Sequence, residues 1–175
     1  MIRKARTADV VQIHKILWHF AKAEKLLARS LSELYTTVRD MVVFEDEPGH
    51  VAGCCTLHIV DEDLAEIRSL AVVESHRRRG IGRELVNACI SEAKELGIRK
   101  LFTLTVEAAF FESMGFQSVD KEGGLPHKVW WDCRHCPKYP DYCDESAMVL
   151  DMTKSSVVGG QWSEAGRLRT EDQKT

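Results

Sequence analysis

The sequence lacks a long hydrophobic segment. Its longest apolar runs, such as residues 51–57, fall far short of the roughly 18 residues that a membrane span needs, so we expect no membrane partner. It also lacks an excess of positive charge, because 24 lysines and arginines stand against 27 aspartates and glutamates and give a net charge of −3. A nucleic-acid-binding protein usually carries a basic face, so we expect no nucleic-acid partner either.

The N-terminal residues, Met-Ile-Arg-Lys-Ala-Arg, lack the apolar stretch of a secretory signal. We therefore expect a cytoplasmic protein. Aromatic residues are also scarce, with six phenylalanines, four tryptophans and three tyrosines, yet 44% of the 175 residues are hydrophobic. That share excludes an intrinsically disordered chain, and the length fits a single domain. We expect this domain to span residues 1–152, with a flexible polar tail at residues 153–175.

Six cysteines are present, at positions 54, 55, 89, 133, 136 and 143. Without an export signal we expect reduced thiols, because the cytosol keeps cysteines from forming disulfides. Cys54 and Cys55 lie in a predicted strand, where neighbouring side chains point to opposite faces, and Cys89 lies on the apolar side of a predicted helix. We therefore expect these three side chains to fill the core.

Hydrophobic periodicity and turn residues predict both helices and strands. Helices are expected over residues 7–22, 30–40, 80–96 and 107–114, the first capped by Thr7 and the second by the pair Ser30 and Glu33. Strands are expected over residues 2–6, 41–45, 51–60, 64–73 and 100–105, after residue 116, and over 147–152. Residues 121–146, rich in glycine, proline and cysteine, interrupt the pattern. Hairpins combined with a helical crossover predict an α/β fold with a mixed sheet.

The strongest chemical signal lies at residues 70–86, which read Leu-Ala-Val-Val-Glu-Ser-His-Arg-Arg-Arg-Gly-Ile-Gly-Arg-Glu-Leu-Val. A strand leads here into a basic turn, and Gly80 and Gly82 open a long amphipathic helix. The first N–H groups of a helix have no internal acceptor and glycines let a ligand approach them, so the pattern predicts phosphate binding. It lacks the third glycine of a dinucleotide fold, where Leu85 stands, and the Gly-Lys-Ser/Thr of a Walker loop. A solvated basic helix start is the plain alternative.

The pattern Arg-x-x-Gly-x-Gly after a Leu-Ala-Val strand resembles the GNAT superfamily of acetyl-CoA-dependent N-acetyltransferases, whose element order matches residues 1–120. The run Phe-Phe-Glu-Ser-Met-Gly-Phe at 110–116 is similar to the family's segment after the fifth strand. The resemblance implies a mostly antiparallel sheet of six to seven strands with helices on both faces. It also implies that acetyl-CoA is bound by Leu70, Ala71, Val72, Arg77, Arg78, Arg79, Gly80, Ile81, Gly82 and Arg83.

Within this superfamily the chain resembles the short bacterial N-acetylglutamate synthases, which lack a kinase-like domain. The resemblance rests on Leu-Ala-Arg-Ser at 27–30, Ala-Glu-Ile-Arg at 65–68, Leu-Phe-Thr-Leu-Thr at 101–105 and Leu-Pro at 125–126. It implies an amino-acid N-acetyltransferase that converts L-glutamate to N-acetylglutamate in arginine biosynthesis. Two alternatives stay open: acetylation of a protein, peptide or other small amine, and a non-catalytic acetyl-CoA, metal or redox sensor. The oligomeric state also stays open, a homodimer included.

Glu66 is the candidate catalytic base. An α-amine titrates near ~8, so a modest base can supply the neutral amine that attacks a thioester, and the resemblance places the family's glutamate at this position. An ion pair with Arg68 is the structural alternative. Many family members carry a tyrosine acid where Phe111 stands, so Ser113, a water or no acid would serve the leaving thiolate.

A glutamate-like acceptor carries two carboxylates, which are bound well by guanidinium groups. We expect Arg29 and Arg68 to bind them, with Lys25 and Lys128 behind. The resemblance supports Arg29, which falls where the family's substrate-binding Arg-Ser pair occurs. The chain departs from the longer synthases at residues 144–145, where Asp-Glu replaces a basic stretch.

The other three cysteines form a local cluster. Cys133 and Cys136 have the spacing of half a zinc site, and Cys143 adds a third thiolate. A fourth ligand could come from His127, His135 or Asp144. The same thiols could instead form one disulfide and a free thiol, or stay reduced on an ordered loop. A zinc site, a redox switch and an inert loop therefore remain open.

Overall fold

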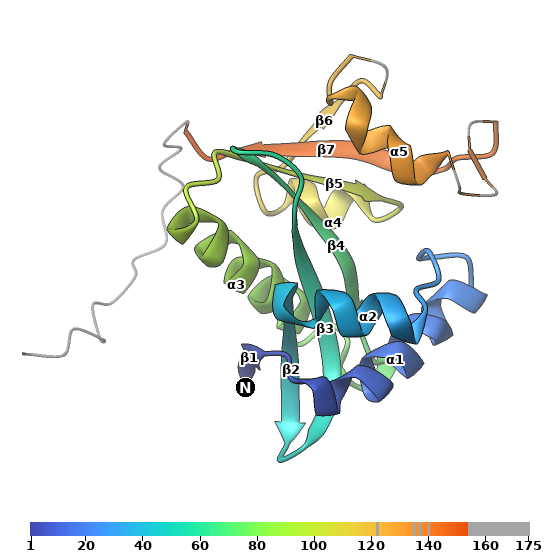
Figure 1. Ribbon diagram of the computed structural model, residues 1–175, viewed down its shortest axis with the longest axis vertical. Coiled ribbons are helices and arrows are strands. Elements are labelled where there is room, and N and C mark those ends of the chain that lie inside the picture. The colour runs from blue at the N-terminus through green and yellow to red at the C-terminus, as the bar shows by residue number, and fades with distance from the viewer. Residues whose placement is uncertain (122, 135, 137, 140, 154–175) are drawn as a thin grey trace, which may run out of the picture.

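The computed structural model describes residues 1–153 except 122, 135, 137 and 140, and it is built around a seven-stranded sheet (Figure 1). The strands are β1 (Ile2–Lys4), β2 (Met41–Glu47), β3 (His50–Ile59), β4 (Leu64–Val72), β5 (Lys100–Thr105), β6 (Gln117–Val119) and β7 (Ser146–Asp151). Their order in the sheet is β1-β2-β3-β4-β5-β7-β6. Every neighbouring pair is antiparallel except the parallel pair β4–β5. The predicted mixed, mostly antiparallel sheet is therefore confirmed.

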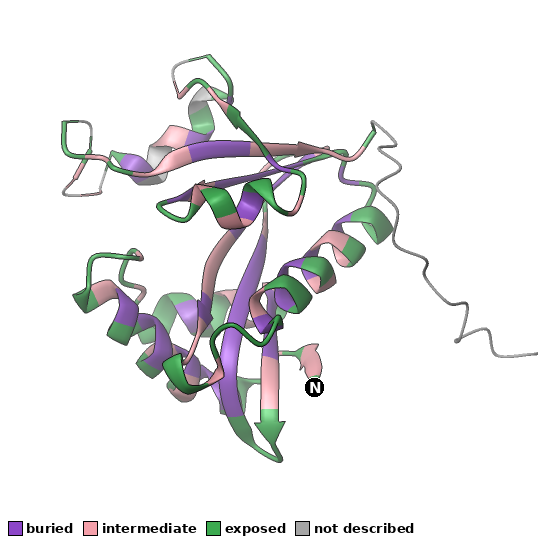
Figure 2. Cartoon of the chain, turned by 180° about the vertical axis from the view of Figure 1, so that it is seen from behind, coloured by how far each residue is buried: buried purple, intermediate pink, exposed green. Residues whose placement is uncertain are grey.

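Helices cover both faces of this sheet. They are α1 (Val10–Lys22), α2 (Leu31–Thr37), α3 (Ile81–Glu95), α4 (Ala108–Glu112) and α5 (Trp130–Cys133), with short 3-10 turns η1 (Thr7–Asp9), η2 (Val38–Asp40), η3 (Glu74–His76) and η4 (His127–Val129). In Figure 1, α1 and α2 lie in front of the sheet, whereas Figure 2, seen from behind, has α3 in front. Among the described residues, no helix is long and apolar enough to cross a membrane.

Each face of the sheet has its own hydrophobic core. Cys54 is buried with α1 and α2, while its neighbour Cys55 and the α3 residue Cys89 are buried in the core on the opposite face. The buried strands are drawn in purple in Figure 2. The prediction that these three cysteines fill the core on alternate sides is confirmed, and burial raises the pKa of Cys54 to about 12.

The two predicted helix starts have different outcomes. The Ser30–Glu33 capping box is present, because the Ser30 N–H donates to Glu33 Oε2 at 2.7 Å and the Glu33 N–H donates to Ser30 Oγ at 3.2 Å. The Thr7 cap is wrong, because residue 7 opens a 3-10 turn and α1 begins at Val10. The Asp9 carboxylate accepts the Arg6 N–H at 2.7 Å, at the start of this 3-10 turn.

Residues 121–146 fold over one end of the sheet. Leu125 and Val129 pack with Phe102 of β5 in a third core cluster, and Trp130 packs against it. The elements η4 and α5 were not expected in this segment. Of the tail predicted at residues 153–175, only residue 153 belongs to the described part of the chain.

Candidate functional site

The site begins where β4 and β5 separate. The two parallel strands pair only from Leu64 and Lys100 to Glu66 and Phe102. Beyond this point they diverge, and Figure 1 shows β2–β4 and β5–β7 running in clearly different directions. Within the described part of the chain, the β4 edge that faces β5 therefore has no strand partner over residues 67–72, and its backbone N–H and C=O groups border the gap.

A β-bulge lies in this free part of β4. Cys54 of β3 pairs with Ala71 and Thr56 pairs with Arg68, so that two β4 residues oppose one β3 residue. One of the two, Ser69, has a φ of 54°, and the Cys54 thiol donates to the Ser69 carbonyl oxygen at 3.5 Å. A bulge bends a strand and increases its twist, which turns the end of β4 away from β5. Nothing in the sequence indicated this bulge, because serine is not a typical left-handed residue.

The gap between the strands opens into a cleft of about 670 Å³, the wide cleft. Its walls come from the free half of β4, the loop before α3, the first turn of that helix, the end of β5 and α4. Phe111, which stands where many GNAT enzymes carry a tyrosine, is buried and contributes to this lining. The other candidate acid, Ser113, does not line the wide cleft. Its hydroxyl donates to the Phe110 carbonyl oxygen at 2.6 Å.

The start of α3 presents free backbone donors to the wide cleft. Gly80 caps the helix with a φ of 82°, a conformation that glycine adopts without strain. The first helical hydrogen bond runs from the Glu84 N–H to the Gly80 carbonyl at 3.1 Å, so the N–H groups of residues 81–83 have no acceptor within the helix. A Cβ at Gly82 would stand 3.6 Å from the Phe110 ring, in ordinary contact. With the positive end of the helix dipole, these donors have the geometry that suits an anion such as phosphate.

Nearly all residues that the resemblance assigned to the cofactor line the wide cleft: Leu70, Ala71, Val72, Arg77, Arg78, Gly80, Ile81, Gly82 and Arg83. The exception among them is Arg79, an exposed residue outside this lining. Two of the arginines have protein contacts as well. The Arg77 guanidinium lies 6.0 Å from the centre of the Phe20 ring, and Arg83 Nη2 donates to Ser113 Oγ at 2.9 Å.

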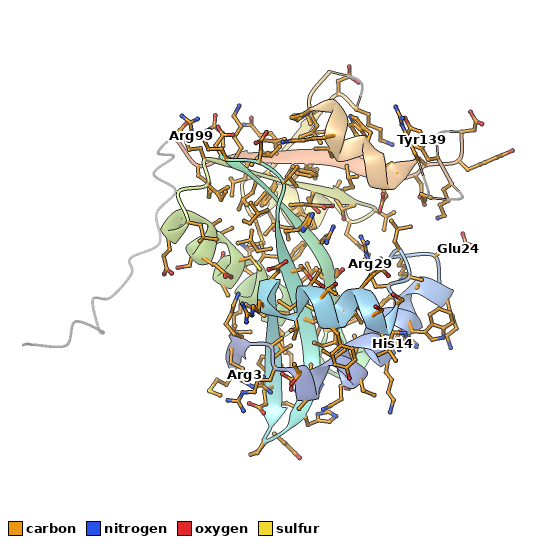
Figure 3. All side chains as sticks on the ribbon, in the orientation of Figure 1. Arg3, His14, Glu24, Arg29, Arg99 and Tyr139 are labelled. Atoms are coloured by element: carbon orange, nitrogen blue, oxygen red, sulfur yellow. The ribbon has the colours of Figure 1, made fainter. Side chains whose placement is uncertain are left out.

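A second, smaller cavity of about 80 Å³, the side pocket, adjoins the wide cleft. It brings together Glu66, Arg68 and Arg29, which the sequence analysis proposed for catalysis and acceptor binding. Arg68 Nη1 lies 3.6 Å from Glu66 Oε2, and Arg29 Nη1 lies 3.7 Å from Glu33 Oε1. The Ser30 capping box fixes the start of α2 directly after Arg29, and Figure 3 shows Arg29 in the segment between α1 and α2.

The two lysines expected behind these arginines lie in different places, and only Lys25 shares a cavity with one of them, Arg68. Lys25 lines the wide cleft and not the side pocket. Lys128 forms an ion pair with Asp61 and lines neither cavity. The ion pair with Asp61, in the short acidic turn after β3, therefore keeps Lys128 away from the side pocket, where its charge was expected to help bind a carboxylate.

Residues from the segment 121–146 complete the side pocket. Its lining includes Tyr139, Glu145 and the cysteines 133, 136 and 143; Tyr139 is labelled in Figure 3. Sequence reasoning placed Glu66 and two arginines here but did not place Glu145 or the thiols. Glu145 is half-buried, and burial together with the neighbouring Asp144 charge raises the pKa of its carboxyl group.

The zinc hypothesis is not supported. All six cysteines are free thiols, and no group of three or more His, Cys, Asp or Glu side chains within residues 1–153, the four gaps aside, could hold a metal ion. Burial, with Glu145 nearby, raises the pKa of Cys133 to about 11. His135, a possible fourth ligand, lies outside the described residues.

Several known proteins are similar to this chain in sequence and in fold. A protein described as an uncharacterized N-acetyltransferase from Chlorobaculum tepidum is 42% identical over 148 residues, which are 85% of this chain and 94% of that protein. An amino-acid acetyltransferase of Mycobacterium tuberculosis is 36% identical over 161 residues, 91% of this chain and 90% of its own length.

Among solved structures, a Mycobacterium tuberculosis protein in complex with CoA superposes with a TM-score of 0.76 and 31% identity, over 86% of this chain and 98% of that chain. N-acetylglutamate synthase from Neisseria gonorrhoeae, complexed with coenzyme A and N-acetyl-glutamate, gives a TM-score of 0.78 at 26% identity. This match covers 87% of the present chain and 35% of the larger synthase.

The family model described as the Acetyltransferase (GNAT) family matches residues 9–116, which include the separating strands β4 and β5 and the helix start at Gly80. This range covers more than half of the chain. The fold, the anion-binding helix start and the relatives agree, and the chain belongs to the GNAT family as an acetyl-CoA-dependent acetyltransferase.

Proposed function

We propose that this enzyme transfers the acetyl group of acetyl-CoA to the α-amine of an amino acid, and that L-glutamate is its acceptor. The observation that carries the proposal is the junction of two cavities: the wide cleft, with the free N–H groups of its helix start, adjoins a side pocket that is lined by two arginines and two glutamates. With glutamate as acceptor the product is N-acetylglutamate, which serves arginine biosynthesis.

The wide cleft fits a long cosubstrate with phosphate groups at one end. The N–H groups of residues 81–83 and the side chains of Arg77 and Arg78 supply donors for the pyrophosphate. The free edge of β4 at residues 70–72 supplies backbone groups for the amide-containing pantetheine arm, in the manner of an added strand. When bound, the thioester supplies an activated acetyl group.

Gly82→Val is expected to weaken acetyl-CoA binding by about 100-fold, because its branched side chain would stand over the free N–H groups and prevent about two charge-assisted hydrogen bonds. Titration calorimetry with acetyl-CoA measures this change. Gly82→Ala is the matched control, because its Cβ makes only an ordinary contact with Phe110, and it should lose less affinity. Wild-type affinity in a folded valine variant would contradict the proposed phosphate site.

Glu66 is proposed to take the proton of the acceptor amine, directly or through a water. The neutral amine then forms the new C–N bond to the acetyl carbon, the C–S bond breaks, and the second amine proton ends on the departing CoA thiolate or in solvent. A thiol has a pKa near ~8.5, so its thiolate leaves without a dedicated acid, which fits the phenylalanine at position 111. Backbone N–H groups near Val72 are proposed to polarise the acetyl carbonyl.

The acceptor's carboxylates are assigned to Arg29 and Arg68. Both guanidinium groups line the side pocket, and both also border a further cavity of about 80 Å³. Planar guanidinium groups bind carboxylates through paired hydrogen bonds. The names of two relatives support this choice, since one is an amino-acid acetyltransferase and the other was solved with N-acetyl-glutamate.

Arg29→Ala is expected to raise the KM for glutamate by about 10- to 100-fold with little change in kcat, because it removes a charged hydrogen-bond donor used equally in binding and in reaction. Steady-state kinetics with glutamate as the varied substrate measure this effect. Arg39→Ala, which removes an exposed arginine of η2, is the control and should behave as the wild type. An unchanged KM in the Arg29 variant would contradict glutamate recognition, and a screen of amino acids would then identify the acceptor.

A further inference from the structure

Glu145 lies at the junction of the two cavities. It directly precedes β7, whose first residue Ser146 pairs with Thr105 at the end of β5. Glu145 belongs to the lining of both the wide cleft and the side pocket, and its charge acts on the Cys133 thiol of the side pocket. Among the described residues, Arg68 is the other ionisable residue in both linings. An amine at this junction would therefore lie close to Glu145.

Glu145 differs from the other charged residues of the side pocket because none of the described residues forms an ion pair with it. Glu66 pairs with Arg68, and Arg29 pairs with Glu33. Within the described residues, the Glu145 carboxylate makes no hydrogen bond and no ion pair. Its nearby cations are engaged elsewhere.

Two lysines could have neutralised Glu145 but have other partners. Lys138 lies 3.4 Å from Asp144 and 3.5 Å from Glu24. Lys121 donates to the Cys143 carbonyl oxygen at 3.4 Å. The ionisable groups around Glu145 are Asp144, Lys121 and Lys138 from the loops, Cys133 from α5, and Glu66 and Arg68 from β4. A half-buried carboxylate with no close counter-ion is unfavourable, and a bound cation would relieve this cost.

We propose that Glu145 is the counter-ion for the ammonium group of the acceptor. This inference rests on the proposed function and deepens it: Arg29 and Arg68 bind the carboxylates, Glu145 holds the ammonium at the junction, and Glu66 then receives its proton. The pocket thus recognises a zwitterion. A dicarboxylic acid without an amine would place no positive charge beside Glu145 and would be disfavoured.

The decisive comparison uses Glu145→Gln, with Asp144→Asn as the control that removes the adjacent, more exposed charge. With glutamate varied, Glu145→Gln is expected to raise the KM by about 10- to 100-fold, because an ionic hydrogen bond is lost. The KM for acetyl-CoA should stay unchanged. Inhibition by glutarate, which is glutamate without its amine, should be unchanged or stronger in the glutamine variant, because a like charge has been removed. Glu145→Asp should recover part of the glutamate affinity.

The outcomes separate this inference from the function on which it rests. If Glu145→Gln weakens the binding of glutamate and of glutarate alike, or changes the binding of neither, Glu145 is not the ammonium partner. If the wild type acetylates no amino acid, the proposed function is wrong, and the same variant is measured with the amine that it does acetylate and with that amine's desamino analogue. Equal melting temperatures of the wild type and both Glu145 variants exclude a folding defect as the cause.

Discussion

Glu66→Gln is expected to lower kcat by about 10²- to 10³-fold, the range typical of a lost general base. Glu66 is the last β4 residue that pairs with β5, opposite Phe102, so it stands where the two strands begin to separate. Its Oε2 lies 3.6 Å from Arg68, which holds the carboxylate in the side pocket. Glutamine keeps the size and the polarity of the side chain but does not accept a proton at neutral pH.

The pH dependence of this variant is the sharper measurement. In Glu66→Gln the residual rate should rise with pH in proportion to the free amine, until the pH passes the pKa of the acceptor amine. The rates are measured with acetyl-CoA and the acceptor at saturation. Glu62→Gln, in the exposed turn before β4, is the control and should keep the wild-type rate and profile. Full activity of Glu66→Gln would show that the amine loses its proton without this residue.

Arg3→Met is expected to lower the free energy of unfolding by about 3 kcal/mol, the loss typical when one partner of a buried ion pair is removed. The Arg3 side chain is only 11% exposed and lies 2.7 Å from Asp9, whose side chain is 6% exposed. Arg3 Nε also donates to Glu45 Oε2 at 2.8 Å. Without the guanidinium, the Asp9 carboxylate would remain buried between β1 and α1 with one backbone donor, the Arg6 N–H.

Urea unfolding monitored by circular dichroism measures this loss. Arg99→Met is the matched control, because Arg99 lies 2.7 Å from Asp63 in a pair that is 65% and 36% exposed. An exposed pair contributes less than about 1 kcal/mol. Equal losses from Arg3→Met and Arg99→Met would contradict a special role for the buried network.

The same network should also make the protein sensitive to acid. The Arg3 guanidinium lowers the pKa of Asp9 and lowers that of Glu45 to about 2. Because both pKa values are lower in the folded chain, the unfolded chain binds more protons at acidic pH. Stability is therefore complete above the unfolded-state pKa values near ~4 and falls as pH drops toward 2. Arg3→Met should flatten this fall, as urea midpoints at several pH values would show.

Sequence alone predicted the parts of the fold that depend on local patterns. The Ser30–Glu33 box and the strand-to-glycine transition at Gly80 are encoded within a few residues, and both are present. The convergence of Arg29 with Glu66 in one pocket followed from the family resemblance, not from spacing. It required the segment between α1 and α2 to lie beside β4 in the folded chain, and no local pattern indicates that path.

The rest could not be predicted because it depends on distant packing. Ser69 adopts its left-handed conformation within β4, where serine gives no signal. In the sequence, Glu145 stood out only as a departure from the basic stretch of the longer synthases. The path of residues 121–146 over the sheet brings it to the junction of the two cavities. The cysteine spacing left a zinc site, a redox switch and an inert loop open, because spacing does not report how the three thiols lie in the fold.

The bulge at Ser69 has one more consequence, which concerns the face of the sheet to which alternate β4 side chains point. Ala65 and Ile67 belong to the core on the α3 face, whereas Ala71 belongs to the core on the α1 face. An uninterrupted strand would place residues 67 and 71 on the same side, so the additional residue in the bulge reverses the alternation. The odd-numbered residues of β4 therefore point into the core on the α3 face before the bulge and into the core on the α1 face after it. Inserting or deleting one residue here would turn Ala71 out of its core, so the residue count between Ile67 and Ala71 is fixed by both faces of the sheet.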